Sequence, residues 1–287
     1  NHESAIKEFK HWHKINVPTF IPKSSKSLRV FWVGSSKDQD ESGFLQALQR
    51  ISNVTIFYNF KEEYGTWGGD SDGFDEETFH DVRRANDSSL LSQIKIAKNN
   101  GDIDLLIGQM WAHRVSKEAL ILVQSMGIPV INISMDDRLP LNWSSNHNIR
   151  LGAVGLAQGT NLVLTTSPET CLWFGLEGCP AIFWSLASSK DVFTPKNNMT
   201  RDIDVLFIGN KYGIRGKIVD YLKKNKIKVQ CYGNGWSNGH ISAPEMAALS
   251  KRSKIILGVG AIGHSSDVYT LKLRDFDAPM SGAFYIT

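Results

Sequence analysis

The stretch Asp204-Val-Leu-Phe-Ile-Gly-Asn-Lys-Tyr-Gly-Ile-Arg215 joins an apolar run to a turn with two glycines and then to a helical pattern. Residues 204–208 predict a buried strand, because apolar and β-branched side chains follow one another there. The pattern over 214–224 predicts a helix. Since a strand followed directly by a helix is the unit of parallel α/β sheets, this stretch predicts an α/β fold.

The same alternation extends in both directions along the chain. Runs that predict strands occur at 28–33, 54–58, 104–108, 129–133, 161–165, 181–184, 204–208, 229–232, 254–258 and 283–286. Patterns that predict helices occur at about 44–51, 88–99, 116–126, 168–177, 214–224, 243–253 and 271–281. Between the second strand and the next helix, residues 61–88 are polar and glycine-rich, which predicts a long loop.

The loop-like stretch 186–202 interrupts this alternation, and we expect the domain junction there. The sequence therefore predicts two Rossmann-like domains, residues 1–190 and 200–287, that face each other across a cleft. In open parallel sheets, ligands bind at the carboxyl ends of the strands, so the loops at those ends should carry the site. The chain lacks an initial Met and ends within an expected strand, so we expect a fragment with an incomplete second domain.

The composition excludes some classes of function. The 287 residues include 32 basic and 29 acidic side chains, with a formal net charge of +3. Nucleic-acid binding needs a concentrated basic surface, so no nucleic-acid partner is expected. No apolar run approaches the roughly 20 residues that span a bilayer. Together with three widely spaced cysteines, which favour free thiols in a reducing compartment, this predicts a cytoplasmic protein without a transmembrane segment.

The turn after residue 208 is one candidate binding site. Gly209 and Asn210 lie where a glycine lets the backbone approach a ligand closely. The helix that follows offers unpaired N–H groups to an anion, and Arg215 adds a charge that can hold two phosphate oxygens. The spacing is equally compatible with a plain turn glycine and a surface arginine.

A second candidate is the segment 271–287, where charged residues precede a small-residue turn and an expected strand. A carboxylate there could bind both hydroxyls of a ribose, and the cations could neutralise a diphosphate. Without further context, an exposed helix with ion pairs explains the segment as well. The candidate binding residues are Lys272, Arg274, Asp277, Ser281 and Gly282.

Three stretches taken together resemble the CgeB-like (spore maturation protein) glycosyltransferase family, which is related to the group 1 glycosyltransferases. They are Asp204 to Arg215, Tyr232-Gly-Asn-Gly-Trp236, and residues 253–257 with 271–282. Asp136-Asp137 and Asp191-Val-Phe-Thr-Pro195 are similar more loosely. The resemblance covers about two thirds of the chain.

This resemblance implies a GT-B fold and transfer of a sugar, of the hexosyltransferase type, from a nucleoside-diphosphate sugar to an unknown acceptor. The second domain would hold the donor, with Arg215 on the diphosphate and Gly233 in the second turn. Asp277 matches the position of a ribose-binding acid, whereas Tyr269 stands where many relatives carry another acid. The related group is mostly retaining and needs no metal or other cofactor.

The first domain would then hold the acceptor. Asp136, Asp137 and His113 follow expected strands, where a catalytic base could lie, although turn and capping roles explain them equally well. Trp67, Trp111 and Trp143 could stack on sugar rings or belong to the core. The pairs Asp38/Asp40 and Asp70/Asp72 have the spacing of a metal motif, but they lie in polar loops, so no metal site is expected.

Three other functions stay open. A GT-B-shaped sugar-nucleotide epimerase would turn over its donor without an acceptor. A two-lobed ligand-binding protein would carry an export signal and no cations for a diphosphate. An inactive relative could serve as a scaffold.

Overall fold

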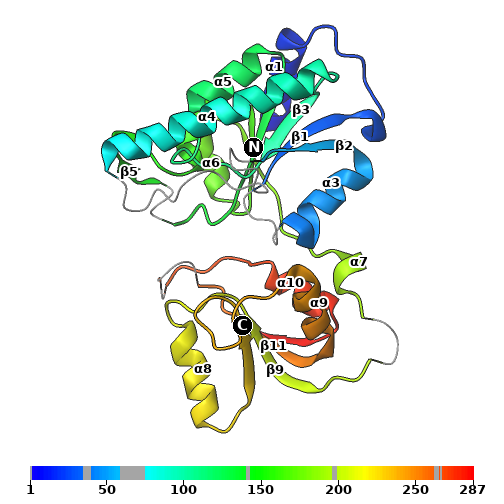
Figure 1. The fold of residues 1–287 in the computed structure, drawn as a ribbon, viewed down its shortest axis with the longest axis vertical. Helices are drawn as coiled ribbons and strands as arrows, with labels where there is room; N and C mark the ends of the chain where they lie inside the picture. Colours follow the sequence, from blue (N-terminus) through cyan, green and yellow to red (C-terminus); the bar gives the residue numbers. More distant parts are fainter. Residues whose placement is uncertain are drawn as a thin grey trace. The chain divides into compact units, whose positions relative to one another are not determined.

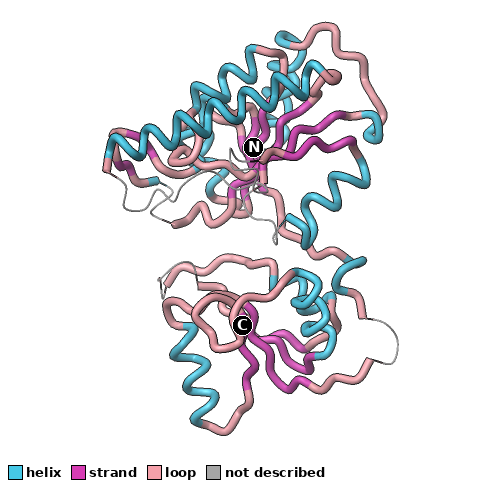
Figure 2. Tube along the Cα trace, viewed as in Figure 1, coloured by secondary structure: helices cyan, strands magenta, loops and turns pink. Residues whose placement is uncertain are grey.

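The structure is a computed structural model that describes residues 2–34, 40–58, 75–139, 143–195, 199–261, 265 and 267–287. The chain divides into two compact units, Asn1–Asp40 with Phe44–Ser185, and Glu41–Gly43 with Leu186–Thr287. Both are α/β units with a parallel sheet (Figures 1 and 2), as the sequence predicts. The cleft between two facing domains stays a prediction. Four residues named above lie outside the described residues: Asp38, Trp67, Asp70 and Asp72.

The first unit contains a six-stranded sheet in the order β2-β1-β3-β4-β7-β8, and all its neighbouring strands are parallel. Its strands are β1 (Arg29–Val33), β2 (Asn53–Ile56), β3 (Leu105–Gly108), β4 (Val130–Ser134), β7 (Leu162–Thr165) and β8 (Ala181–Phe183). Val30 of β1 pairs with Val54 on one side and Leu105 on the other. A central strand of this kind is covered on both faces, which explains why Val30 to Val33, the buried part of β1, are all apolar.

Helices cover this sheet on both faces. Leu90 of α4 and Leu120 of α5 pack with Phe31 in one buried cluster, and Leu45 of α3 packs with Trp32 in another. The unit also contains a small hairpin and short helical turns that the sequence patterns do not predict. Besides the six-stranded sheet, the elements of this unit are α1 (His2–Asn16), η1 (Ser25–Ser27), α3 (Leu45–Ile51), α4 (Glu76–Asn99), α5 (Lys117–Ser125), β5 (Ser145–Asn146), β6 (Ile149–Arg150), η4 (Ala153–Gly159) and α6 (Thr170–Leu176). The short helix η2 (Asp40–Phe44) has its middle residues Glu41–Gly43 in the second unit.

Helix α4 begins at Glu76, so the expectation of a loop up to residue 88 is wrong over its last part. The Asp75 side chain accepts a hydrogen bond from the backbone N–H of Thr78 at 2.9 Å and caps the helix. Glu76 and Glu77 in the first turn stabilise the helix further, because their negative charges interact with the positive end of its dipole. Phe79 then buries its ring one turn in, which anchors the polar beginning of the helix.

The second unit contains a four-stranded parallel sheet in the order β10-β9-β11-β12. Its elements are α7 (Lys190–Phe193), β9 (Ile203–Ile208), α8 (Arg215–Lys224), β10 (Val229–Tyr232), α9 (Ala243–Arg252), β11 (Ser253–Leu257), α10 (Arg274–Met280) and β12 (Phe284–Ile286). Phe207 packs with Val219 of α8 on one face of the sheet. Leu206 packs with Ala278 of α10 on the other. Alternate residues of one strand thus supply two separate cores.

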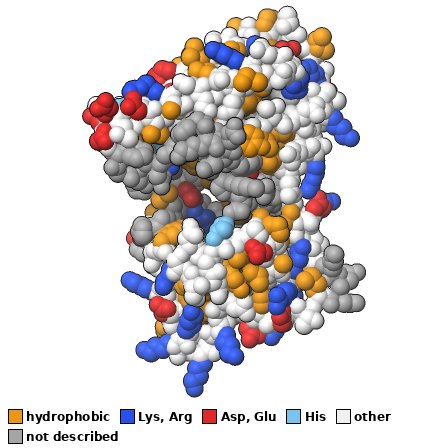
Figure 3. All heavy atoms as spheres, viewed as in Figure 1, with side chains coloured by type: hydrophobic (Ala, Val, Ile, Leu, Met, Phe, Trp, Pro, Cys, Tyr) orange, Lys and Arg blue, Asp and Glu red, His pale blue; other side chains and the backbone are white. Residues whose placement is uncertain are grey.

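No described helix combines the length and the apolar character that crossing a membrane requires. On the face drawn in Figure 3, the coloured basic and acidic side chains are intermingled over both units.

The ends of β9 and β10 meet through two glycines. The N–H of Gly209 donates to the carbonyl of Tyr232 at 2.8 Å. Gly209 and Gly233 have φ angles of +145° and +124°, in the region that favours glycine. A Cβ atom at residue 233 would lie 2.6 Å from the carbonyl carbon of Gly209 and 3.0 Å from the nitrogen of Asn210. The two turns can therefore approach each other only while residue 233 has no side chain.

Replacing this glycine should destabilise the second unit. We expect Gly233→Ala to lower its free energy of unfolding by about 2 kcal/mol, because the methyl group adds backbone strain and a clash with backbone atoms. Hydrogen exchange of the β9 amides against denaturant concentration measures the change. Gly216→Ala is the matched control, since it faces only the flexible end of Lys211 and lies in a helix. Equal stability of the two variants would contradict the close approach.

Candidate functional site

Two guanidinium groups lie beside this glycine turn, at the carboxyl end of β9. Arg215 is the first residue of α8 and is only 5% exposed, and Arg274 is the first residue of α10. Their Cζ atoms lie 5.9 Å and 5.2 Å from the ring centre of Phe207. Arg215 also lies over Tyr212, at 3.9 Å. Aromatic faces of this kind attract cations, so these rings hold both guanidinium groups at one place.

Backbone carbonyls fix the two side chains further. Arg215 Nη1 donates to the carbonyl of Asn210 at 2.9 Å, and Arg274 Nη1 donates to the carbonyl of Ile208. A Cβ atom at Gly209 would lie 2.6 Å from Arg274 Nη1 and 3.5 Å from Arg215 Nη1. The missing side chain of Gly209 therefore leaves room for the Arg274 guanidinium group, and Arg215 lies at ordinary contact distance.

The electrostatics of this pair favour an anion. Burial lowers the pKa of Arg274, and the neighbouring charge of Arg215 lowers it further. The buried Nε of Arg274 has no hydrogen-bond partner, and no ion pair between described residues involves this side chain. Two like charges held together repel each other, and an anion between them would offset that repulsion.

The start of α8 also favours the binding of an anion. No side chain caps this ten-residue helix, and the positive end of its dipole lies at Arg215, whose own N–H donates to the Tyr212 carbonyl at 3.2 Å. The turn itself is well fixed: Asn210 Oδ1 accepts from the N–H of Asn234 at 3.1 Å, and Lys211 N–H donates to the Asn234 carbonyl at 2.8 Å. A fixed turn ahead of a helix is the usual geometry of an anion site.

The structure thus brings five predicted donor-site residues together and places the other four in α10 or within two residues of its ends. The five are Gly209, Asn210, Arg215, Gly233 and Arg274. Lys272 precedes α10, and its N–H donates to Asp275 Oδ2 at 2.6 Å. Ser281 and Gly282 end the helix, where the Ser281 hydroxyl donates to the Ala278 carbonyl at 2.7 Å and the Ser281 carbonyl accepts from Arg201 Nη2 at 2.9 Å.

Asp277 lies between these two ends and is 8% exposed. Burial raises the pKa of its carboxyl group to about 6, while the nearby Ser188 hydroxyl and the charge of Arg274 act in the opposite direction. This acid follows Arg274 by three residues, so the two lie on one face of the helix.

In the first unit, Asp137 is buried at 1% exposure, directly after β4. Its carboxylate accepts hydrogen bonds from the hydroxyls of Ser134, Thr165 (2.5 Å) and Thr170 (3.4 Å). Burial raises its pKa and these hydroxyls lower it. Its carbonyl accepts from Trp143 Nε1 at 2.6 Å, so this tryptophan belongs to the same packed region. The contacts of Asp137 tie the ends of β4 and β7 together.

His113 and Asp136 lie in loops that follow β3 and β4. The Nδ1 of His113 lies 2.8 Å from the carbonyl of Leu151, which can only accept, so Nδ1 carries a proton. In the neutral ring, Nε2 is then an acceptor. Trp111 stacks on the His113 ring at 6.0 Å between centroids. Asp136 has a φ of +59°, which an aspartate tolerates in a tight turn.

Sequence reasoning missed the aromatic residues that hold the two arginines. Phe207 is an ordinary strand residue by pattern, and Tyr212 is an ordinary turn residue. By sequence, Trp236 indicates only the family resemblance. In the structure its Nε1 donates to the Gly209 carbonyl at 2.8 Å, and Lys211 Nζ lies 5.2 Å from its ring centre. An aromatic residue three positions before Arg215 is the one local signal that could have indicated the stacking.

Comparisons with known proteins show only a distant likeness. No family model matches the chain, and no curated protein matches its sequence. Among solved structures, it is similar to the glycosyltransferase SsfS6 of Streptomyces sp. SF2575, with 10% identity and a TM-score of 0.35 over 83% of this chain and 78% of that chain. So distant a likeness says nothing about substrates or residues, and membership of the CgeB-like family stays a prediction. Among the described residues, no three His, Cys, Asp or Glu side chains form a group that could hold a metal ion.

The raised pKa of Asp277 gives a testable dependence of stability on pH. Its folded pKa of about 6 exceeds the ordinary value of 3.8, so the folded state binds this proton more tightly. The free energy of unfolding should therefore fall as the pH rises from about 4 to about 6, by at most about 3 kcal/mol.

Urea unfolding at a series of pH values checks this expectation. Asp277→Asn should remove most of the decline and stabilise the second unit at neutral pH. Asp220→Asn, an exposed change on α8, is the control and should keep the decline. An unchanged pH profile in Asp277→Asn would refute the buried, protonated acid.

Proposed function

We propose that this protein is a glycosyltransferase whose second unit binds a nucleoside-diphosphate sugar. The observation that carries the proposal is the pair of guanidinium groups, Arg215 and Arg274, held beside a glycine turn at the start of α8. A diphosphate carries charge on several oxygens at once. Two fixed guanidinium groups and a helix N-terminus match that charge with donors in more than one direction.

The same arrangement suits the chemistry of transfer. When the bond from the sugar to the diphosphate breaks, negative charge grows on the departing oxygen. Donors fixed in advance stabilise that charge without having to reorganise. The carbonyl contacts of Asn210 and Ile208 and the rings beneath both cations supply this fixation. We therefore propose a reaction that needs no metal ion. Retention of configuration is proposed from the resemblance to the mostly retaining group 1 glycosyltransferases.

The remaining donor contacts are proposals of the same kind. We propose that Asp277 binds the ribose, because it shares a helix face with Arg274, and that Lys272 adds charge near the start of α10. Ser281 and Gly282 stay in the proposal as the turn that positions α10. The bonds of Ser281 to Ala278 and Arg201, and the bond from the Gly282 N–H to the Pro279 carbonyl, support that positioning role.

On the acceptor side, we propose His113 as the base, because it lies in the loop after β3 and the Leu151 carbonyl fixes the orientation of its ring. Asp136 is retained as a second acceptor-side group. The oxygens of Asp137 already accept three hydroxyl hydrogen bonds, which favours a supporting role for this residue. The acceptor itself is not identified by these residues.

Nucleotide binding tests the donor site. Titration with UDP, ADP and GDP should raise the thermal midpoint with at least one of them. Arg215→Met and Arg274→Met should each weaken that binding about tenfold to a hundredfold, since each removes charge-assisted hydrogen bonds. The matched control is Arg252→Met, which removes an exposed arginine paired with Asp202 and should leave affinity unchanged.

No thermal shift with any nucleotide would overturn the proposal. Turnover of a UDP-sugar without an acceptor would instead favour the epimerase.

Removal of divalent metal tests the second feature of the proposed reaction. EDTA should leave nucleotide affinity within about twofold of its untreated value, because cationic side chains take the role of the metal. Isothermal titration of the best nucleotide, with and without EDTA, measures this. A large loss that added magnesium restores would show that a cation bridges protein and diphosphate.

A further inference from the structure

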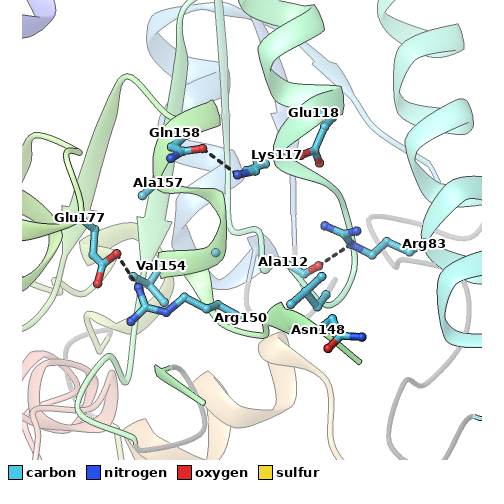
Figure 4. A pocket seen from close by; sticks show the side chains of 12 residues that line it. Arg83, Ala112, Lys117, Glu118, Asn148, Arg150, Val154, Ala157, Gln158 and Glu177 are labelled. Carbon is cyan, nitrogen blue, oxygen red and sulfur yellow. Dashed lines mark hydrogen bonds and ion pairs between the residues drawn. The ribbon is translucent and has the colours of Figure 1, made fainter. Parts of the chain in front are cut away.

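A cavity of about 310 Å³ lies in the first unit, and none of the proposed catalytic or donor residues lines it. Figure 4 shows it between α4, the start of α5, the β5–β6 hairpin and η4. Charged and amide side chains surround it. Those that matter here are Arg83, Lys117, Glu118, Arg150, Gln158 and Glu177.

The cavity owes its shape to a glycine in η4. A Cβ atom at Gly155 would overlap the carbonyl of Arg150 and would lie 2.5 Å from Cβ of Ala112. Only a glycine therefore lets η4 pack this closely against the hairpin and the loop after β3. Val154 and Ala157 of η4 then give the lining an apolar component.

Each of the three cations is fixed by one bond to a protein oxygen, as the dashed lines of Figure 4 mark. Arg83 Nε donates to the Ala112 carbonyl at 2.7 Å, and Lys117 Nζ donates to Gln158 Oε1 at 2.7 Å. Arg150 Nη1 lies 2.5 Å from Glu177 Oε2. An arginine has five N–H donors and a lysine three, so each keeps donors for a ligand. Fixing them beforehand lowers the entropy cost of binding.

The charges of the lining do not cancel. Three cations and the two carboxylates of Glu118 and Glu177 leave a formal charge of +1. Burial lowers the pKa of Arg83, against the attraction of Asp87 and Glu118. An anionic group in the cavity would stabilise these cations, and the carboxylates and amides around it can accept hydrogen bonds from hydroxyl groups.

We propose that this cavity binds a monosaccharide-sized sugar acid, with its carboxylate between the cations and its hydroxyls on Glu118, Gln158 and Glu177. The volume is at the lower end of small-molecule pockets, which suits one sugar ring and is small for a nucleotide sugar. All the lining residues belong to the first unit, so the inference does not depend on the donor site of the second unit.

Isothermal titration of the whole chain with glucuronate, glucose and glucose 6-phosphate tests this assignment. Glucuronate should bind saturably at millimolar concentration or below, and glucose should bind at least about tenfold more weakly, because it lacks the charge. Saturating UDP should leave glucuronate binding unchanged. Equal binding of glucose, preference for the phosphate, or no binding at all would each overturn the proposal.

Matched variants locate the site. Lys117→Met and Arg150→Gln should each weaken glucuronate binding about tenfold, since each removes a charged donor. Lys95→Met, on the exposed side of α4, should leave it within about twofold. Thermal unfolding checks that each variant is folded. Two pocket variants are used so that the test still works if one of them does not fold. Full affinity in both folded pocket variants would place the ligand elsewhere and refute the proposal.

Discussion

The mutual repulsion of two guanidinium groups over one phenylalanine ring constrains much of the second unit. Arg215 and Arg274 can stay together because Phe207 and backbone carbonyls hold them while the glycine turn leaves them room. This glycine turn requires Gly233, because the missing side chain lets the loops after β9 and β10 contact each other. The backbone conformation of the turn, its packing and the two charges therefore depend on the same few residues, and a bound anion would offset the remaining repulsion.

Sheet geometry explains why this chemistry lies at the strand ends. Strands covered on both faces carry mostly apolar side chains, so groups that could bind a ligand gather where a strand stops and a loop begins. The second unit follows this rule through Arg215 and Arg274, which start helices α8 and α10. In the first unit, Asp137 and His113 come from loops after β4 and β3.

The two units stabilise buried charge by different means. In the first unit, hydroxyls surround the Asp137 carboxylate, and the cations of the cavity are each tied to a protein oxygen. In the second unit, Arg274 contacts the Phe207 ring and donates to the Ile208 carbonyl, and the charge of Asp275 also favours its protonated form. A carboxylate whose oxygens already accept several hydrogen bonds serves structure, whereas a cation that keeps N–H donors for a further partner is suited to a charged ligand. This difference separates Asp137 from the arginine pair in the roles that we propose.

The sequence by itself determined the α/β class, most strand positions to within one or two residues, and the glycine turn with Arg215. These features are local: apolar runs, glycine positions and helical periodicity act over a few neighbouring residues. The sequence pattern did not predict where α4 begins. The residues there are polar, but the Asp75 cap and the buried ring of Phe79 stabilise the first turns of the helix.

Only the tertiary structure decided that Arg274 reaches the carbonyl of Ile208, 66 residues away, and that Asp137 is enclosed by hydroxyls. The cavity between α4, α5 and η4 also exists only in the folded chain, because residues far apart in the sequence line it. Each depends on which elements become neighbours, and that choice arises from packing between segments far apart in the chain, which no local pattern records.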